Sequence, residues 1–142
     1  AALLLRRLGH PVNMVDIAPN ALEEPARAAL GPGLTFTLAS AWDLPEDFPV
    51  APWGFSAEML MTIPPAKIEL TLENIRRTCE NFFCQVYNRI DVRVGHHANL
   101  IQEGPEWWQA LLEAYWPDVT RIESQEISTR YIYSCRNVQK TK

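Results

Sequence analysis

Apolar and polar positions along the N-terminal third of the chain predict short helices and strands in turn. A helix is expected over residues 2–8, with Gly9 in the position of a C-terminal cap. Alternating apolar and β-branched residues predict strands over residues 11–17 and 34–38. Between them a helix is expected over residues 19–30, because proline suits the first helical position and acidic side chains suit the first turn.

The rest of the chain continues the alternation. A loop rich in proline and acids (residues 40–52) precedes a mostly apolar stretch that predicts a buried strand over residues 53–60. Pro64-Pro65 then opens a helix whose apolar side chains share one face, namely Ile68, Leu72, Ile75 and Cys79. The remaining expected elements are a strand over 82–90, a polar loop over 91–104, a helix over 105–116, and strands over 119–126 and 129–135.

This element order predicts an α/β fold with a Rossmann-like, doubly wound and mostly parallel sheet, because parallel strands need helical crossovers. Only a Ser-containing turn separates the last two strands, so they are expected to form an antiparallel C-terminal hairpin at the sheet edge. We expect residues 1–135 to form the domain and residues 136–142 to be a polar tail.

Composition excludes several classes of protein. The 142 residues are 47% hydrophobic and 21% charged, which is typical of one globular domain rather than a disordered chain. A net charge of −4 does not indicate nucleic-acid binding, and no apolar run has the roughly 20 residues of a membrane span. An odd number of cysteines, three, without paired spacing indicates reduced thiols and a cytoplasmic location.

The first candidate motif is the run Val15-Asp16-Ile17-Ala18-Pro19-Asn20, at the end of a predicted strand. A carboxylate there can accept hydrogen bonds from ribose hydroxyls, because doubly wound sheets bind nucleotides at the carboxyl ends of their strands. A turn or helix-capping aspartate is the competing interpretation of Asp16.

Two further motifs follow the next strands. After residues 34–38 comes the segment 39–45, where Ser40 and the backbone N–H of Ala41 could contact the edge of an adenine and Trp42 could stack on its face. The competing interpretation is a surface loop with Trp42 at the edge of the core. After the middle strand comes the segment 59–65, which also suits a plain connection to the next helix.

Together these motifs resemble the class I S-adenosylmethionine-dependent methyltransferase family. In that family a strand-end acid followed by a hydrophobic residue and a Ser/Ala-Pro step holds the cofactor ribose, as the run Asp16-Ile17-Ala18-Pro19 would here. The segment 40–45 resembles the family's adenine-binding segment that ends in Asp-Leu-Pro. The resemblance therefore implies S-adenosylmethionine as cofactor, bound by Asp16, Ile17, Ser40, Ala41 and Trp42.

The chain also departs from the family pattern. Ser40 stands where many members have Asp, and Met61-Thr62 stand where many have Glu-His. The family's first strand and its Gly-rich turn have no counterpart, since Gly31-Pro32-Gly33 follows the second helix instead. We expect the domain to be N-terminally incomplete, which leaves three interpretations: a truncated product, a strand donated by a partner or a second copy, or a remnant fold.

Several other residues have a functional and a structural interpretation. His96-His97 would be a general base or substrate contact, or part of a solvated loop; with Glu103 they lack metal-ligand spacing, so no metal site is expected. Trp107 would be an aromatic lid or, like its neighbour Trp108, a packing residue. The run Tyr87-Asn88-Arg89 ends a strand where the resemblance implies substrate contacts, and Cys84 is expected to be a core residue.

The expected function is methyl transfer from S-adenosylmethionine to a small-molecule or other unidentified acceptor. Such enzymes work mainly by positioning, so no acid–base pair needs to stand out, and the catalytic residues stay unassigned. The alternative is a non-catalytic, methyltransferase-like binding subunit or remnant. A nicotinamide-dependent oxidoreductase fits less well, because the chain lacks a Tyr-Lys pair at catalytic spacing.

Overall fold

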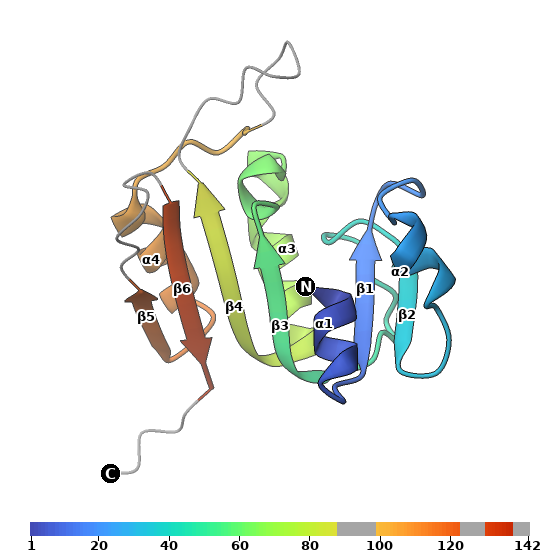
Figure 1. Ribbon diagram of the computed structural model, residues 1–142. Helices are drawn as coiled ribbons and strands as arrows, with labels where there is room; N and C mark the ends of the chain where they lie inside the picture. Colours follow the sequence, from blue (N-terminus) through green and yellow to red (C-terminus); the bar gives the residue numbers. More distant parts are fainter. Residues whose placement is uncertain (88–98, 123–129, 138–142) are drawn as a thin grey trace. The chain divides into compact units, whose positions relative to one another are not determined.

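The structure is a computed structural model that describes residues 1–87, 99–122 and 130–137 (Figure 1). The chain divides into two compact units, Ala1–Pro49 (unit 1) and Val50–Lys142 (unit 2). Each unit combines helices with a sheet, and each is described by itself below. The predicted α/β class, with parallel strands and an antiparallel C-terminal hairpin, is confirmed.

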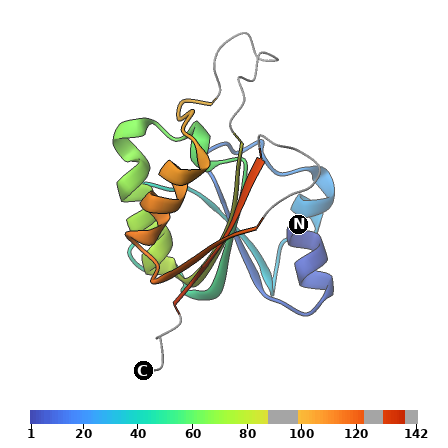
Figure 2. The same ribbon diagram turned by 90° about the vertical axis from the view of Figure 1, so that its left-hand side faces the viewer.

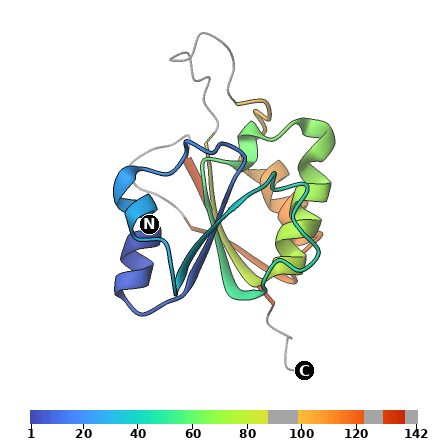
Figure 3. The same cartoon turned by 90° about the vertical axis from the view of Figure 1, so that its right-hand side faces the viewer.

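Unit 1 contains two helices and two parallel strands. Its elements are α1 (Ala2–Arg7), β1 (Val12–Asp16), α2 (Glu24–Ala28) and β2 (Leu34–Leu38). The strands pair in register from Val12 opposite Leu34 to Asp16 opposite Leu38. Figure 3 shows α1 and α2 on the same side of this strand pair, so the two strands are connected by a helical crossover of the expected kind.

Polar contacts rather than apolar packing hold much of unit 1 together. The Arg6 guanidinium donates to the carbonyl of Ala29 at 2.8 Å, which ties α1 to the end of α2. Across the strands, the Thr35 hydroxyl donates to the Asn13 side chain at 2.7 Å. Gly9, at φ +88°, provides the left-handed turn between α1 and β1 that its position after the helix predicts.

The second helix is shorter than its sequence pattern predicts. The expectation of a helix over residues 19–30 is wrong at its start, because α2 begins at Glu24. The segment before it turns instead, with the Ala21 N–H donating to the Ala18 carbonyl at 3.1 Å. Pro25 then occupies the first turn of α2, the place that the pattern assigned to Pro19.

Unit 2 is built on a mixed four-stranded sheet. Its elements are β3 (Ala51–Ala57), the short 3₁₀ turns η1 (Leu60–Thr62) and η2 (Pro65–Lys67), α3 (Ile68–Thr78), β4 (Cys79–Tyr87), α4 (Pro105–Glu113), β5 (Asp118–Ile122) and β6 (Arg130–Arg136). The strand order is β3-β4-β6-β5, with β3 and β4 parallel and β6 antiparallel to both of its neighbours. Arg136, expected to begin the tail, is the last residue of β6.

The core of unit 2 lies between one face of this sheet and the two helices. Figure 2 shows α3 and α4 on the same side of the strands. Alternate β4 side chains face them, and Phe82 stacks on Trp116 with ring centroids 5.4 Å apart. The Tyr133 hydroxyl donates to the Pro105 carbonyl at 2.7 Å, which fixes α4 on β6. Further fully buried side chains are Leu60, Leu72, Cys84, Val86, Trp108 and Leu112.

Two boundaries in unit 2 differ from the sequence pattern. The strand expected over residues 53–60 is β3, which ends at Ala57, and Leu60 lies in η1. Cys79, expected on the apolar face of a helix, is the first residue of β4. Its extended backbone (φ −148°, ψ 146°) ends α3, and its thiol donates back to the Ile75 carbonyl at 3.1 Å. Residues 88–90 and 123–129 lie outside the described part of the chain.

Gly54 in β3 is required by close packing rather than by backbone conformation. A Cβ added there would lie 2.7 Å from the Cys79 sulfur and 3.2 Å from the Phe82 ring. Gly54 and Phe82 are partners in the parallel ladder, so the missing side chain lets Cys79 fill the space against the sheet.

Candidate functional site

Asp16 is the last residue of β1, as its motif predicts. Its Oδ1 accepts a hydrogen bond from the Ala18 N–H at 2.9 Å, which is the turn geometry of the competing structural interpretation. No hydrogen bond in the described part of the chain uses its second oxygen, Oδ2. The carboxylate therefore shapes the turn after β1 and still has an oxygen able to accept from a ligand hydroxyl.

Parallel pairing places the second motif beside the first. Leu38 lies opposite Asp16 at the end of the ladder, and the Ala39 N–H donates to the Asp16 carbonyl at 3.0 Å. The segment with Ser40, Ala41 and Trp42 thus leaves the sheet at the same edge as Asp16 and Ile17. Ser40, Ala41 and Trp42 are half-buried, and Ile17 is 61% exposed.

The third motif, residues 59–65 of unit 2, has a structural role in its middle. Met61 is 2% exposed, and its carbonyl accepts hydrogen bonds from the N–H groups of Leu100 and Ile101. The Thr62 hydroxyl caps the turn by donating to the Met59 carbonyl at 2.7 Å. These contacts favour the interpretation of this motif as a connection between β3 and α3.

Of the other candidate residues that the structure describes, some are buried in the core and one is partly exposed. Trp108 is buried at the core, whereas Trp107 is 38% exposed and meets it edge to face, with ring centroids 5.0 Å apart. Cys84 is fully buried, so its expected core position is confirmed. His96, His97, Asn88 and Arg89 lie outside the described residues.

The three cysteines are not suited to nucleophilic catalysis. All are free and buried. Burial raises the pKa of the Cys79 thiol from its ordinary value of 9.0 to about 11. A hydrogen bond with Cys135, together with burial, raises the pKa of Cys84 well above its ordinary value. Because the thiolate is the reactive form, these side chains act as small core residues.

One residue that the sequence patterns did not single out has an unusual backbone. Glu58, directly after β3, has φ +58°, and among the non-glycine residues described it alone has a positive φ. This left-handed conformation costs a residue with a side chain roughly 1–2 kcal/mol. Neither glycine nor asparagine marks the position, so no signal in the sequence indicates it.

Glu58 belongs to a polar cluster at the carboxyl ends of β3 and β4. Its Oε1 accepts from Gln85 Nε2 at 3.0 Å and from the Arg130 guanidinium at 3.2 Å. The same guanidinium lies over the Tyr87 ring, 5.7 Å from its centroid. The Glu58 and Arg130 side chains are 48% and 32% exposed. An ion pair this exposed contributes about 0–1 kcal/mol, so it does not by itself offset the strained backbone.

Within the described residues, no group of three histidine, cysteine, aspartate or glutamate side chains is arranged to hold a metal ion. In the same residues, no helix is long and apolar enough to cross a membrane.

Comparison with known proteins identifies the fold. No model of a known protein family matches the chain, and no curated protein matches it. Solved structures do match, at identities low enough that they show the fold alone.

Three of these structures illustrate the likeness. The CMeT domain of the citrinin polyketide synthase is 15% identical, with a TM-score of 0.70 over 96% of this chain and 42% of that one. The 1,6-didemethyltoxoflavin-N1-methyltransferase of Burkholderia thailandensis is 17% identical, with a TM-score of 0.71 over 96% and 65%. The methyltransferase domain of bacterial CtHen1 is 12% identical, with a TM-score of 0.72 over 96% and 83%. The chain has the class I methyltransferase fold and spans less than two thirds of the first two structures.

Proposed function

We propose that this chain binds S-adenosylmethionine and belongs to an enzyme that transfers its methyl group to an acceptor. The observation that carries the proposal is the parallel register of β1 and β2, which brings the Asp16 and Ser40–Trp42 motifs to one sheet edge. Three methyltransferases of the same fold were crystallised with S-adenosylhomocysteine, the product that remains after methyl transfer. Their bound product supports the same cofactor here.

Unit 1 would bind the adenosine part of the cofactor. Asp16 would accept from the ribose hydroxyls through Oδ2, since Ala18 already occupies Oδ1. The Ser40 hydroxyl and the Ala41 N–H would contact the adenine edge, and Trp42 would stack on its face. Ile17, largely exposed after β1, would cover the sugar with an apolar side chain.

Methyl transfer would depend more on how the acceptor and the cofactor are positioned than on acid–base groups of the protein. When bound, the cofactor supplies an electrophilic methyl group carried on a sulfonium. The buried thiols of Cys79 and Cys84 do not compete for that group, because their raised pKa values keep them protonated. What the protein contributes is a bound acceptor held in near-attack geometry, an effect worth about 7–11 kcal/mol at its largest.

Calorimetric titration of the full chain with S-adenosylmethionine tests the proposal. The informative variant is Asp16→Asn, which keeps an oxygen to accept from Ala18 but removes the charge. A hydrogen bond to a charged group contributes about 1.5–3 kcal/mol, so the dissociation constant should rise roughly 10- to 100-fold. Asp47→Asn, an exposed aspartate elsewhere in unit 1, is the matched control and should leave the affinity unchanged.

Two outcomes of this titration would contradict the proposal. Absence of measurable cofactor binding by the unmodified chain would remove the function itself. If the Asp16→Asn and Asp47→Asn variants bind the cofactor equally tightly, Asp16 is not the ribose contact. Its role is then only to shape the turn after β1.

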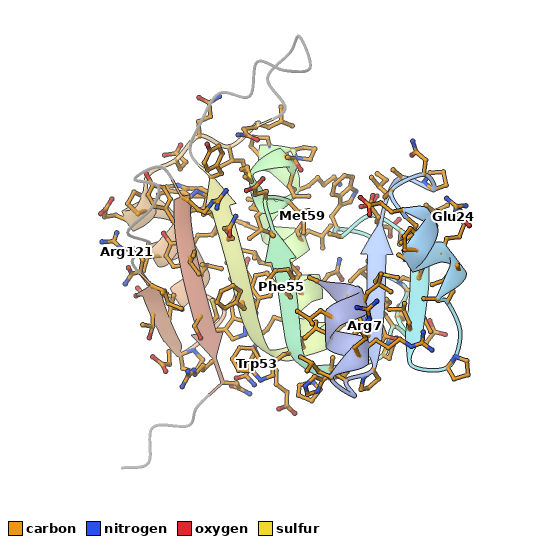
Figure 4. The ribbon with its side chains drawn as sticks, in the orientation of Figure 1. Arg7, Glu24, Trp53, Phe55, Met59 and Arg121 are labelled. Carbon is orange, nitrogen blue, oxygen red and sulfur yellow. The ribbon has the colours of Figure 1, made fainter. Side chains whose placement is uncertain are left out.

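A second candidate function, a binding subunit that accepts an added strand, is favoured by β3. In the described part of the chain β3 pairs with β4 alone, and its Trp53 and Phe55 are 51% and 55% exposed on one face (Figure 4). A strand that pairs on one side alone favours pairing with another strand, and a partner could also cover these exposed aromatic side chains. Sedimentation velocity tests the version in which a second copy supplies it: a dimer that Phe55→Lys dissociates supports this function, and a monomer at all concentrations contradicts it.

A further inference from the structure

We propose that Glu58 recognises the methyl acceptor through an N–H group, so that the acceptor is an amine. The inference rests on the proposed methyl-transfer function and names the substrate class for it. Four features carry it: the strained backbone of Glu58, the way its carboxylate is held, its place in the sheet and the charge that it presents.

The backbone of Glu58 is held in a conformation that its side chain does not favour. Its N–H donates to the Gln85 carbonyl at 2.9 Å, which continues the contact between β3 and β4 one residue past the last strand pair, Ala57 and Gln85. A glycine would adopt φ +58° without strain. Strained residues of this kind cluster at functional sites, where the side chain is needed at that point.

The carboxylate is oriented by two donors that both use the same oxygen. Gln85 Nε2 and the Arg130 guanidinium bind Oε1, and no hydrogen bond in the described part of the chain uses Oε2. Arg130 lies 72 positions later in the chain and is itself held over the Tyr87 ring. Two donors on one oxygen restrict the carboxyl group and leave Oε2 to accept from a hydrogen-bond donor on a ligand.

The position in the sheet agrees with ligand binding. Glu58 follows the carboxyl end of β3, and Tyr87 ends the parallel strand β4 beside it. Open α/β sheets bind their ligands outside the carboxyl ends of the parallel strands. Glu58 is also half-exposed, so a small molecule can reach its carboxylate.

The chemistry of the cluster selects the kind of acceptor. Arg130 and Gln85 both donate to Oε1, so Oε2 is the oxygen left to accept a hydrogen bond, although the pair of Glu58 and Arg130 is neutral as a whole. A carboxylate or phosphate would meet this oxygen with like charge, whereas an amine would donate an N–H to it. An alcohol would also donate but carries no positive charge at neutral pH, so it should bind more weakly. An amine bound as its ammonium would release one proton to water before its nitrogen lone pair attacks the methyl carbon, and S-adenosylhomocysteine would leave as the C–S bond breaks.

Titration of the full chain, labelled with ¹⁵N, tests this with three probes of one shape: benzylamine, benzyl alcohol and benzoate. Benzylamine should shift the backbone amides of Glu58 and Gln85 saturably, at least tenfold more tightly than benzyl alcohol, and benzoate should leave them unmoved. Glu58→Gln should weaken benzylamine at least tenfold. The matched control is Glu113→Gln, because Glu113 is also exposed and accepts from a glutamine, Gln109 Nε2, at 3.0 Å.

The inference is overturned if the three probes shift the amide signals equally, or if Glu58→Gln binds benzylamine as tightly as the unmodified chain. Glu58 is then only one half of a surface ion pair. The cofactor titration is a separate measurement. A chain that binds S-adenosylmethionine but not benzylamine loses the acceptor assignment and keeps the proposed function. A chain that binds benzylamine through Glu58 but no cofactor loses the proposed function, and Glu58 then marks an amine site alone.

Discussion

The two units of this chain are stabilised in different ways. In unit 2 a sheet face and two helices enclose large apolar side chains such as Trp108, Trp116 and Leu72. In unit 1 the helices bury none of their residues, and Leu34 is the one apolar side chain of the described unit that is fully buried. Strand pairing and the Arg6 contact with Ala29 take the place of a core there.

The difference matters because the candidate adenosine contacts are all in the weakly packed unit. Binding loops are drawn from the less stable parts of proteins, since few buried contacts resist their movement. A ligand between the Asp16 and Ser40 segments would add the contacts that unit 1 lacks. Among its described residues, the well-packed unit instead carries one non-glycine residue with a positive φ, Glu58, at the end of a sheet strand.

The largest expected effect comes from removing a core side chain. Leu72→Ala leaves a cavity under α3 and should lower the free energy of unfolding by about 2–5 kcal/mol. Leu8→Ala in unit 1, where the side chain is 65% exposed, should change it by less than about 0.5 kcal/mol. Urea unfolding followed by tryptophan fluorescence measures both. Equal losses would mean that the two units do not differ in packing.

Alkaline pH should destabilise unit 2 through its buried thiols, Cys79 among them. The pKa of Cys79 is raised from 9.0 to about 11, so the unfolded chain loses this proton before the folded one does. The protonated Cys79 thiol therefore stabilises the folded state fully below pH 9, and this contribution is lost as the pH rises to 11. At 1.36 kcal/mol per pKa unit, the loss in the free energy of unfolding is about 2–3 kcal/mol. Urea unfolding between pH 8 and 11 measures the slope. Cys79→Ser should reduce the slope, while Cys84, whose pKa is also raised, contributes the part that remains. An unchanged slope would contradict the contribution of Cys79.

Glycine substitutions distinguish space from backbone conformation. Gly54→Ala forces a Cβ within 2.7 Å of the Cys79 sulfur and should cost about 1–3 kcal/mol. Gly9→Ala meets no atom within 4 Å but has φ +88°, so it should cost roughly 1–2 kcal/mol through strain alone. Adding Cys79→Ala should recover part of the loss for Gly54→Ala and none for Gly9→Ala. Thermal unfolding of the single and double variants gives the coupling, and recovery at both glycines would contradict the steric explanation.

The smallest expected effect is at Glu58. Glu58→Gly removes an ion pair worth about 0–1 kcal/mol but also relieves a backbone cost of roughly 1–2 kcal/mol. The free energy of unfolding should therefore stay within about 1 kcal/mol of the unmodified chain, although the carboxylate is gone. A loss above about 2 kcal/mol in urea would show that Glu58 is retained for stability rather than for binding.

Sequence patterns predicted the features that depend on residues close together in the chain. The strands around Val12–Asp16 and Leu34–Leu38, and the single apolar face of α3, follow from residue alternation and helical spacing. The α2 start was missed because Pro19 and Pro25 both suit a first helical turn, and only the turn from Ala18 to Ala21 separates them. Cys79 was missed because an apolar residue suits a helix face as well as a buried strand.

The sequence by itself determined the α/β class, the order of its elements and the position of Asp16 at a strand end, since these depend on neighbours a few residues apart. Tertiary structure decided the rest. It set the pairing that brings Ala39 to Asp16, and it joined Glu58 to Gln85 and Arg130, which lie 27 and 72 positions away. Such contacts depend on which strands pair and in what register, and that choice is made by burying a common core rather than by any one segment.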